Sequence, residues 1–452
     1  MRDSSLRYVI FPILNLATGC LRRYRFLSDL QWNRQTLGEW QEHRLSQLVA
    51  HAYSSVPFYR KRLKEAGLSP SDVQCLGDLS KLPITSKHDL GAFPKELVST
   101  AVTSRRRRLT NTSGTGQMLE FYDDTNVRGF VVASRLLFES WMGLAVGDRT
   151  VRLTNWPSTW RNRVIGELRV QVSRLEGDAH EAIEVVKALH PSSLIGTVSI
   201  LSSFSNNILR SGVEARMDLR GIATSADMLL PSHRDMIAKA FESPVFDRYG
   251  LAEMSGYVAQ ECDTHQGLHV NEGLVIAEVV KDGQLCGPGE TGRLILTNLH
   301  NYVMPFIRYD TGDIATVGDE CSCGRSFAVL ARIEGRSPGW VITKSIPIAW
   351  TSFLVQLQSM NFAKIEQFQF VQKKVGELTL LIAPRSALVN SEITQLTRHM
   401  NSIRSLVTVK VEIVDSIEPA ASGKHILFKP LNVSNDSREG EIPSENSPSE
   451  NP

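Results

Sequence analysis

The sequence predicts an α/β fold, in which a large multi-layer N-terminal domain with a β subdomain precedes a small, mobile α+β C-terminal domain. Between residues 100 and 300, short β-rich runs alternate with helical runs, and this alternation is typical of a parallel sheet covered by helices. Strand-like runs then dominate from residue 273 to residue 318, which predicts the β subdomain. After Arg336 the pattern begins again over about a hundred residues, enough for a separate domain.

The boundaries of the individual elements follow from hydrophobic periodicity. An amphipathic helical pattern over 37–63 is interrupted at Ser54 to Pro57, and the second helix stops near Gly67. Further predicted elements are strands beginning at 151, 193, 219, 243, 273, 292, 313, 367, 377 and 407, and helices over 177–189, 229–242 and 390–404. We divide the chain into a helical segment (1–36), a large domain (37–335), a C-terminal lid domain (336–431) and a disordered tail (432–452).

Length and composition describe a soluble globular protein of two or three domains. The chain has 452 residues, 42% of them hydrophobic and 22% charged, and this length exceeds one typical core. A net charge of +2 gives no reason to expect nucleic acid as a partner. The run YVIFPILNLATGCL is too short to span a bilayer, and we favour a packed helix over one that grazes a membrane. Six cysteines do not make a disulfide scaffold in so long a chain, which favours a reducing, cytoplasmic location.

A segment rich in Thr, Ser and Gly, TNTSGTG, precedes the strand-like run LEFY. Glycine lets backbone N–H groups point into one concavity and hydroxyls add donors, so the segment can hold phosphate oxygens. The Walker pattern is absent, because Gly114 and Gly116 stand two apart and Gln117 occupies the place where a lysine would be sought. An ordinary hairpin turn is the alternative interpretation of this stretch.

Two further stretches place polar side chains where α/β sheets bind ligands. In FDRYGLAEM (246–254) a strand ends in Tyr-Gly, and Glu253 follows four residues after the aromatic ring. In MPFIRYDTGD (304–313) Asp313 lies on a predicted turn and could bind a ribose diol with two oxygens. Each has a simpler interpretation, as the first turn of a helix and as a solvated hairpin.

The order of these motifs resembles that of adenylate-forming acyl-activating enzymes. The series is TSGTG (112–116), YGLAE (249–253), RYDTGD (308–313), EGR (334–336) and SGK (422–424). The segments LVAHAYSSVPFYRKRLKEAGLSPSDV and DLSKLPITSKHDL resemble the phenylacetate-CoA ligase branch, including CapK-type proteins of capsular polysaccharide clusters. The resemblance covers residues 37 to 430 and implies ATP and Mg²⁺ as cofactors.

The resemblance also implies roles for individual residues. The loop over the β- and γ-phosphates of ATP would be Thr112, Ser113, Gly114, Thr115 and Gly116. Adenine would stack on Tyr249 and bond to Asp247, and the same nucleotide-binding set would include Ser225, Ala226 and Gly250. Asp313 would bind the ribose, and Arg336 would lie near the nucleotide at the domain boundary. The catalytic residues would be Glu253, which holds Mg²⁺, Arg308, which lies near the nucleotide, and Lys424, which reaches the α-phosphate.

Such residues suit the chemistry of adenylation. A carboxylate that attacks the α-phosphorus builds negative charge on the phosphoryl oxygens, so cations must lie there and water must be excluded. A lysine on a mobile lid does both, although SGK could also be a solvated turn.

The cysteines include a set with the spacing of a metal site. Cys262 and His269 lie in ECDTHQGLH, and Cys321 and Cys323 lie in DECSCGR. Three thiolates and one imidazole can hold structural Zn²⁺, since four protein ligands leave no open position for substrate. His265 could replace His269, and four reduced, unliganded side chains are the alternative. Arg105 to Arg108 could attract ATP, but a solvated charged face is the interpretation we favour.

Departures from the family pattern bear on the acyl acceptor. The phosphate loop is one residue short, Ala252 replaces a threonine, the hinge reads Gly-Arg-Ser-Pro-Gly, and the following loop ITKSIPIAW lacks glycine. We therefore expect adenylation of a small-molecule carboxylic acid and favour an amine or hydroxyl acceptor over CoA, in polysaccharide or secondary-metabolite biosynthesis. A nucleotide-binding scaffold without turnover and a true aryl-CoA ligase are the alternatives, and a homodimer is compatible with each.

Overall fold

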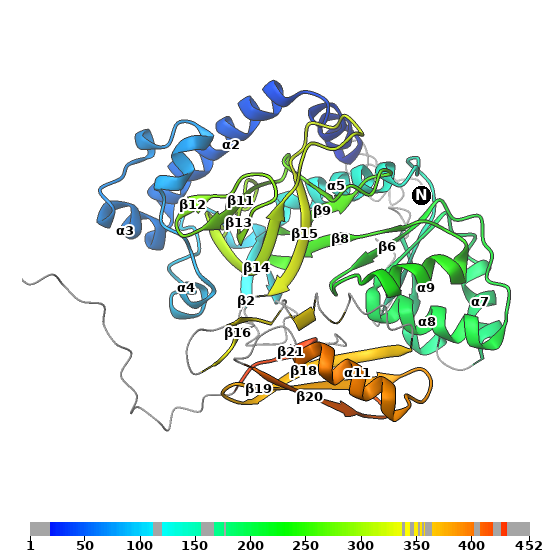
Figure 1. Ribbon diagram of the computed structural model, residues 1–452. Helices are drawn as coiled ribbons and strands as arrows, with labels where there is room; N and C mark the ends of the chain where they lie inside the picture. The colour runs from blue at the N-terminus through cyan, green and yellow to red at the C-terminus, as the bar shows by residue number, and fades with distance from the viewer. Residues whose placement is uncertain are drawn as a thin grey trace, which may run out of the picture. The chain divides into compact units, whose positions relative to one another are not determined.

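The computed structural model describes residues 19–111, 120–154, 167–175, 178–336, 340–343, 348–350, 353–354, 357, 364–401, 407–418 and 426–431. Contacts divide these residues into two compact units, a large one up to residue 336 and a small one over 340–418 and 426–431. Figure 1 shows the elements of each unit. The predicted α/β fold class, with a β subdomain in the large unit and a small α+β C-terminal unit, is confirmed.

The large unit contains a five-stranded parallel sheet, an eight-stranded antiparallel sheet and a two-stranded hairpin. After a helical stretch over 19–30, its helices are α2 (Arg34–Ser55), α3 (Pro57–Glu65), α4 (Lys87–Ala92), α5 (Arg128–Trp141), α7 (Ala179–Lys187), α8 (Val198–Ser211) and α9 (Pro231–Phe241). Its 3-10 turns are η1 (Pro70–Asp72), η2 (Leu76–Lys81), η3 (Ser104–Arg106), η4 (Thr125–Val127), η5 (Val172–Arg174) and η6 (Ala252–Met254). Its strands are β1 (Arg107–Asn111), β2 (Glu120–Asp124), β3 (Thr150–Thr154), β4 (Glu167–Gln171), β5 (Ser193–Thr197), β6 (Gly221–Ser225), β7 (Val245–Phe246), β8 (Arg248–Leu251), β9 (Gly256–Glu261), β10 (Leu268–Val270), β11 (Val275–Lys281), β12 (Gln284–Leu285), β13 (Thr291–Asn298), β14 (Tyr309–Val317) and β15 (Val329–Arg336).

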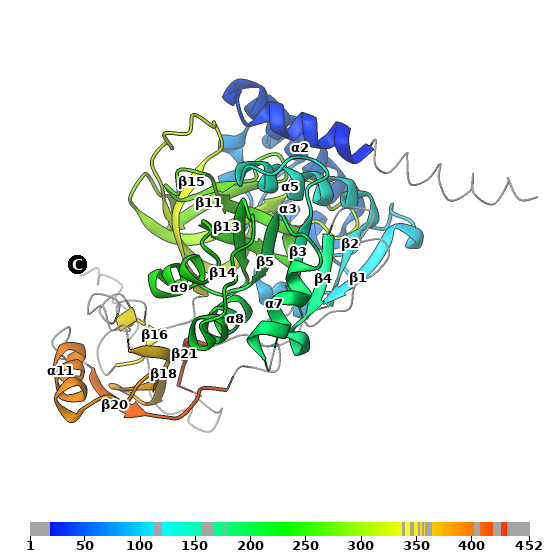
Figure 2. The same ribbon diagram turned by 90° about the vertical axis from the view of Figure 1, so that its right-hand side faces the viewer.

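The parallel sheet has the strand order β4-β3-β5-β6-β7. Its central strands β5 and β6 are buried along almost their whole length, as expected for strands covered on both faces. Helices α7, α8 and α9 pack beside it, as Figure 2 shows. The Asp178 carboxylate caps the start of α7 by accepting from the N–H of Glu181, and Gly212 ends α8 in the left-handed conformation. Because all five strands run parallel to one another, their carboxyl ends lie at the same edge of the sheet. Ligands bind at this edge in such sheets.

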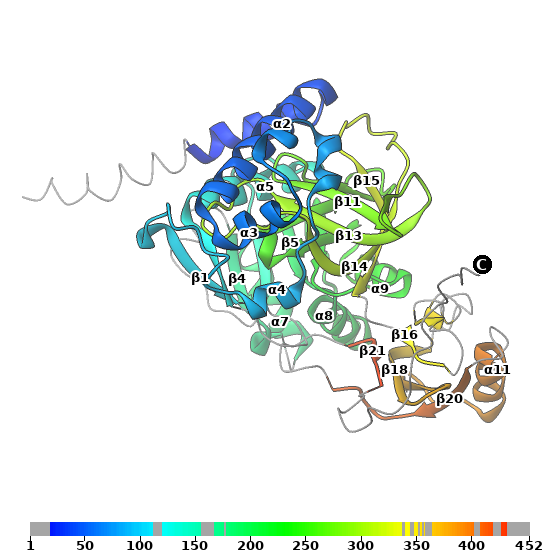
Figure 3. The ribbon, with the colours of Figure 1, turned by 90° about the vertical axis from the view of Figure 1, so that its left-hand side faces the viewer.

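The antiparallel sheet has the strand order β12-β11-β13-β14-β15-β10-β9-β8. Its main core lies under α2 and α3, where Leu45 and Leu48 pack with Val275 and Leu294 (Figure 3). The buried side chain of Gln41 in α2 donates to a backbone carbonyl of the segment before β11, at 3.0 Å. The N-terminal helices are thus an integral layer of the large unit, and apolar burial holds them on the sheet.

The small unit is built on one four-stranded sheet and one helix. Its elements are β16 (Trp340–Val341), β17 (Ile348–Ala349), β18 (Ile365–Lys374), β19 (Glu377–Pro384), α11 (Asn390–Asn401), β20 (Thr408–Ile413) and β21 (Phe428–Lys429). The sheet order is β20-β19-β18-β21. The end of α11 is tied to β20 because the amide of Asn401 both donates to and accepts from the backbone of Val409, at 2.8 Å each.

Two local predictions need correction. The DTGD stretch is neither an isolated turn nor a hairpin, since it lies inside β14. The register against β13 shifts at this point and Gly312 has φ +75°, so Thr311 to Asp313 form a bulge that re-aims Asp313. Glu253 lies on the 3-10 turn η6 rather than in the first turn of an α-helix.

The apolar run YVIFPILNLATGCL lies mostly outside the described residues. Within those that are described, no helix has both the length and the hydropathy needed to cross a membrane.

Candidate active site and metal centre

The loop predicted to hold phosphate joins the two strands of the β1–β2 hairpin. The loop itself, with Thr112, Ser113, Gly114, Thr115 and Gly116, lies outside the described residues. The base of the hairpin is fixed by two ion pairs, one between Arg106, just before β1, and Asp124 of β2, and one between Arg108 of β1 and Asp123 of β2. Arg106 and Arg108 of the basic run thus clamp the hairpin by pairing with buried carboxylates, while Arg105 and Arg108 are themselves exposed, as on a solvated charged face.

Tyr249 and Asp313 are brought together from motifs 64 residues apart. Tyr249 projects from β8 and donates its hydroxyl proton to a carboxylate oxygen of Asp313 in the β14 bulge. Burial and the Asp313 charge raise the pKa of Tyr249 well above its usual value, so the phenol stays protonated as a donor. A carboxylate can accept several hydrogen bonds, so Asp313 could accept one from a ribose hydroxyl as well as the one from Tyr249.

Glu253 is oriented by a residue that sequence reasoning missed. Its carboxylate, on a residue only 2% exposed, accepts a hydrogen bond from the hydroxyl of Tyr309 at 3.1 Å. Its backbone carbonyl accepts from the amide of Asn298 at 3.3 Å. Tyr309 stands next to Arg308 in the RYDTGD motif, so its position was visible in the sequence, but its partner 56 residues earlier was not.

Asp247 lies between β7 and β8, near the carboxyl end of β6. Its carboxylate accepts from the hydroxyl of Thr224 at 3.1 Å, and its backbone N–H donates to Glu261 at 2.8 Å. Burial, together with the charge of Glu261, raises the pKa of Asp247 to about 6. Ser225 ends β6, and Ala226 follows it with φ +71°. These residues occupy the predicted ligand-binding edge of the parallel sheet.

Arg308 makes a different set of contacts from the one its predicted catalytic role requires. Its guanidinium forms a bidentate pair with Glu278, at 3.0 Å for both Nε and Nη2. Its Nη1 donates to the carbonyl oxygens of Ser80 and Leu82 at 2.8 and 2.7 Å. Both ionic side chains are 7% exposed. We therefore propose that Arg308 joins η2 to the antiparallel sheet as a structural residue.

The structure says less about the remaining predicted residues, which are Lys424, Arg336 and Gly250. Lys424 lies outside the described residues. Arg336 ends β15, and its backbone lies directly across from Asp313 of β14. The structure explains why residue 250 is a glycine, because a Cβ atom there would lie 2.4 Å from the carbonyl oxygen of Gly256.

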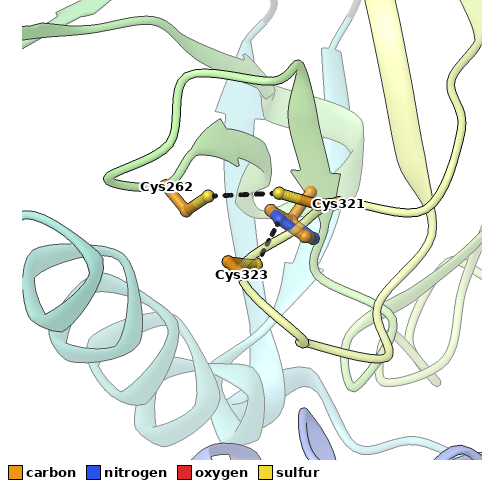
Figure 4. A group of neighbouring side chains, drawn as sticks. Cys262, Cys321 and Cys323 are labelled. Atoms are coloured by element: carbon orange, nitrogen blue, oxygen red, sulfur yellow. Dashed lines mark hydrogen bonds between the residues drawn. The ribbon is translucent and has the colours of Figure 1, made fainter.

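The predicted metal ligands gather at one place in the large unit. Cys262 follows β9, His269 lies in β10, and Cys321 and Cys323 lie in the connection from β14 to β15. Their ligand atoms all lie within 4.8 Å of one another. The Sγ atoms of Cys262 and Cys321 are 3.7 Å apart, and Sγ of Cys323 is 3.3 Å from Nε2 of His269 (Figure 4).

These four side chains fit a tetrahedral zinc ion. Two sulfurs at about 2.3 Å from one tetrahedral zinc lie roughly 3.8 Å apart, close to the observed separation. Nδ1 of His269 donates to the carbonyl of Phe327 at 3.2 Å, which leaves Nε2 as the free ligand atom. His265 instead contacts Glu261 at 3.1 Å and the ring of Phe246. The geometry thus favours His269 over His265.

Comparison with known proteins gives a consistent result. The chain is 27% identical over 378 residues to the phenylacetate-coenzyme A ligase of Thermus thermophilus, covering 76% of this chain and 80% of that protein. It is 21% identical over 406 residues to protein CapK of Staphylococcus aureus, covering 86% and 88% of the two chains. No family model matches the chain.

The fold also has solved counterparts. The crystal structure of 2-hydroxyisobutyryl-CoA ligase in its postadenylation state superposes with a TM-score of 0.73 at 20% identity, covering 87% of this chain and 89% of that chain. An AMP complex of O-succinylbenzoate coenzyme A synthetase from Bacillus subtilis gives 0.51 at 17% identity, covering 74% and 70%.

Fold, motif order and sequence similarity together define the class: the chain is an adenylate-forming ligase. Within that class its sequence is similar to phenylacetate-coenzyme A ligases and to CapK, as the resemblance of its motifs predicted.

Proposed function

We propose that this protein uses ATP to activate a small carboxylic acid as an acyl adenylate, and then passes the acyl group to an acceptor. The observation that carries the proposal is the convergence of Tyr249 with Asp313, and of Glu253 with Tyr309. These contacts bring the YGLAE motif together with the RYDTGD motif. The proposal is further supported by the similarity to enzymes of the phenylacetate-coenzyme A ligase branch.

The reaction has two balanced steps. A carboxylate oxygen of the acid attacks the α-phosphorus of ATP, the bond from that phosphorus to the bridging oxygen breaks, and pyrophosphate leaves. The acceptor then attacks the acyl carbon, loses its proton, and AMP leaves. In this scheme Tyr249 and Asp313 bind the nucleoside, while Lys424 stabilises the charge that develops on the α-phosphate.

The proposal includes two metals with separate roles. Glu253 would hold Mg²⁺, which neutralises charge on the ATP phosphates. Zn²⁺ would be structural, because the four ligands Cys262, His269, Cys321 and Cys323 complete a tetrahedron. Its effect would be to join β9, β10 and the connection between β14 and β15.

Separate observations favour two classes of acyl acceptor. The loop composition after the hinge favours an amine or hydroxyl, since Pro338 has a fixed φ and ITKSIPIAW offers no glycine. The second candidate is CoA, favoured by similarity to proteins named as phenylacetate-coenzyme A ligases.

Exchange of labelled pyrophosphate into ATP tests the first step. Aryl, fatty, amino and sugar acids are screened with Mg²⁺ and ATP, and the expected result is exchange that depends on one class of acid. No exchange with any acid, from protein that binds ATP, would favour the nucleotide-binding scaffold. With the active acid identified, rapid and saturable acyl-CoA formation would show CoA as the acceptor, whereas AMP release unaffected by CoA would favour an amine or hydroxyl.

A further inference from the structure

A buried cluster of charges lies between the parallel sheet and the β8–β9 hairpin, and none of it is used by the mechanism above. It contains four arginines and two glutamates, which are Arg135 and Glu139 of α5, Arg152 of β3, Glu167 and Arg169 of β4, and Arg248 of β8. Among the described residues of the cluster, four guanidinium groups therefore face two carboxylates, which leaves an excess of two positive charges. Burial of unbalanced charge is costly without a partner of opposite sign.

The carboxylates are already engaged by the arginines around them. Glu167 contacts Nε of Arg169 at 2.9 Å and Nε of Arg152 at 3.3 Å. Glu139 accepts a hydrogen bond from the hydroxyl of Thr150 at 2.9 Å. Arg152 and Arg169 also lie directly opposite each other on neighbouring strands, an arrangement in which like charges repel. Residues 155–166, which join these two strands, contain no Asp or Glu in the sequence.

Arg248 shows the same lack of compensation in a more buried position. The residue is 5% exposed and lies over the rings of Phe138 and Tyr257, at 5.5 and 5.2 Å. Among the described residues, its Nη1 atom has no hydrogen-bond partner. Burial lowers the pKa of Arg248 to about 10, so the group still carries its charge at neutral pH.

Arg152 and Arg169 are the partly exposed arginines of the cluster, and Arg152 also contacts the β8–β9 hairpin. The side chain of Arg152 is 22% exposed, its Nη2 donates to the hydroxyl of Tyr257 at 3.3 Å, and no contact of Nη1 is found within the described residues. Tyr257 pairs with Gly250, the neighbour of Tyr249 in β8. Tyr257 therefore lies on the β8–β9 hairpin, which also carries Tyr249, and the Arg152 side chain contacts this hairpin.

We propose that Arg152 and the hydroxyl of Tyr257 bind a second carboxylate of the acid substrate, so that the enzyme activates dicarboxylic acids. This inference rests on the proposed adenylation and names its substrate class. The guanidinium fork matches a carboxylate, and the added negative charge offsets the positive excess of the cluster. Monocarboxylic acids of the same size leave Arg152 without that counter-charge.

The test compares isosteric acids in the pyrophosphate exchange assay. Glutarate is paired with valerate, and para-carboxyphenylacetate with para-nitrophenylacetate, whose nitro group has the shape of a carboxylate without its charge. The protein should prefer the dicarboxylate of at least one pair, by kcat/KM. Arg152→Gln should lower that preference at least about tenfold, as expected when a charged hydrogen bond is lost. Arg152→Lys should retain part of it, and Arg216→Gln, at a 73% exposed surface position, should retain all of it.

Calorimetric binding of glutarate without ATP separates this inference from the proposed function. Glutarate binding that Arg152→Gln abolishes, in protein that shows no exchange, would support the second-carboxylate site while refuting adenylation. Two results would refute the site while supporting adenylation. One is equal exchange activity with the dicarboxylate and the monocarboxylate of each pair. The other is an equal loss of kcat/KM for both members of a pair in Arg152→Gln. Absence of both exchange and Arg152-dependent binding would overturn both.

Discussion

Arg308→Met is expected to destabilise the large unit because it leaves Glu278 buried without its cation. The two side chains form a bidentate pair and are each 7% exposed. Removal of one partner from a buried ion pair costs about 3–5 kcal/mol. The carbonyls of Ser80 and Leu82 also lose their donor, at about 1 kcal/mol each. In the double variant Arg308→Met/Glu278→Leu no charge remains buried, so only the carbonyl loss of about 1–3 kcal/mol should persist.

The sign of the pH dependence follows from Glu278. Burial raises the pKa of this carboxyl in the folded state, and Arg308 opposes that rise. Without the arginine the pKa rises further, and the folded state then binds a proton more readily than the unfolded state. Stability contributed by such a group is lost as pH rises. The deficit of Arg308→Met against the parent protein should therefore shrink as pH falls from about 8 to about 5.

Thermal melting and pyrophosphate exchange, measured on the same three proteins, decide the role of Arg308. A structural role predicts that the double variant recovers most of the melting temperature and most of the exchange activity. A double variant that melts like the parent but has lost exchange at least about a hundredfold would refute the structural role, and would restore the catalytic one.

Three further predictions concern the nucleotide, the lid and the metal. Asp313→Asn should raise the KM for ATP about tenfold or more, because the charge-assisted hydrogen bond to ribose is lost. Tyr249→Phe should raise this KM by a smaller factor. An unchanged KM in Asp313→Asn would exclude Asp313 from the nucleotide site. Lys424→Ala should leave ATP binding nearly intact while adenylation falls at least about a hundredfold, and an equal loss of binding and rate would contradict a transition-state role. Metal analysis should find one zinc per chain. Cys321→Ser should lower both zinc content and melting temperature, whereas His265→Ala should keep the metal; full stability after chelation would rule out a structural zinc.

Motif order and strand alternation were enough to predict the fold class, because each depends on local patterns. The alternation that begins at VRLTN corresponds to β3, β5 and β6, and the helix predicted over 229–242 corresponds to α9. The β14 bulge was not predictable, since it depends on register against β13.

Side-chain partners were harder to predict, because they depend on contacts between distant segments. Arg308 stands in a motif that suggests catalysis, yet its partner Glu278 lies 30 residues earlier on another strand. The choice of His269 over His265 required knowing that β10 pairs with β9 and β15. The arginine-rich cluster was not predictable from the sequence either, since its members are spread over four elements of the large unit.

The clamped hairpin has a consequence for how its loop can change. Asp123 is held by Arg108 and also accepts from the hydroxyl of Ser255, which immediately follows the turn that carries Glu253. The orientation of β1 and β2 is thus set by side chains that lie outside the loop between them. We therefore expect insertions or deletions within 112–119 to leave this anchor in place. The loop that is one residue shorter than the usual form therefore joins two strands whose anchoring side chains all lie outside it.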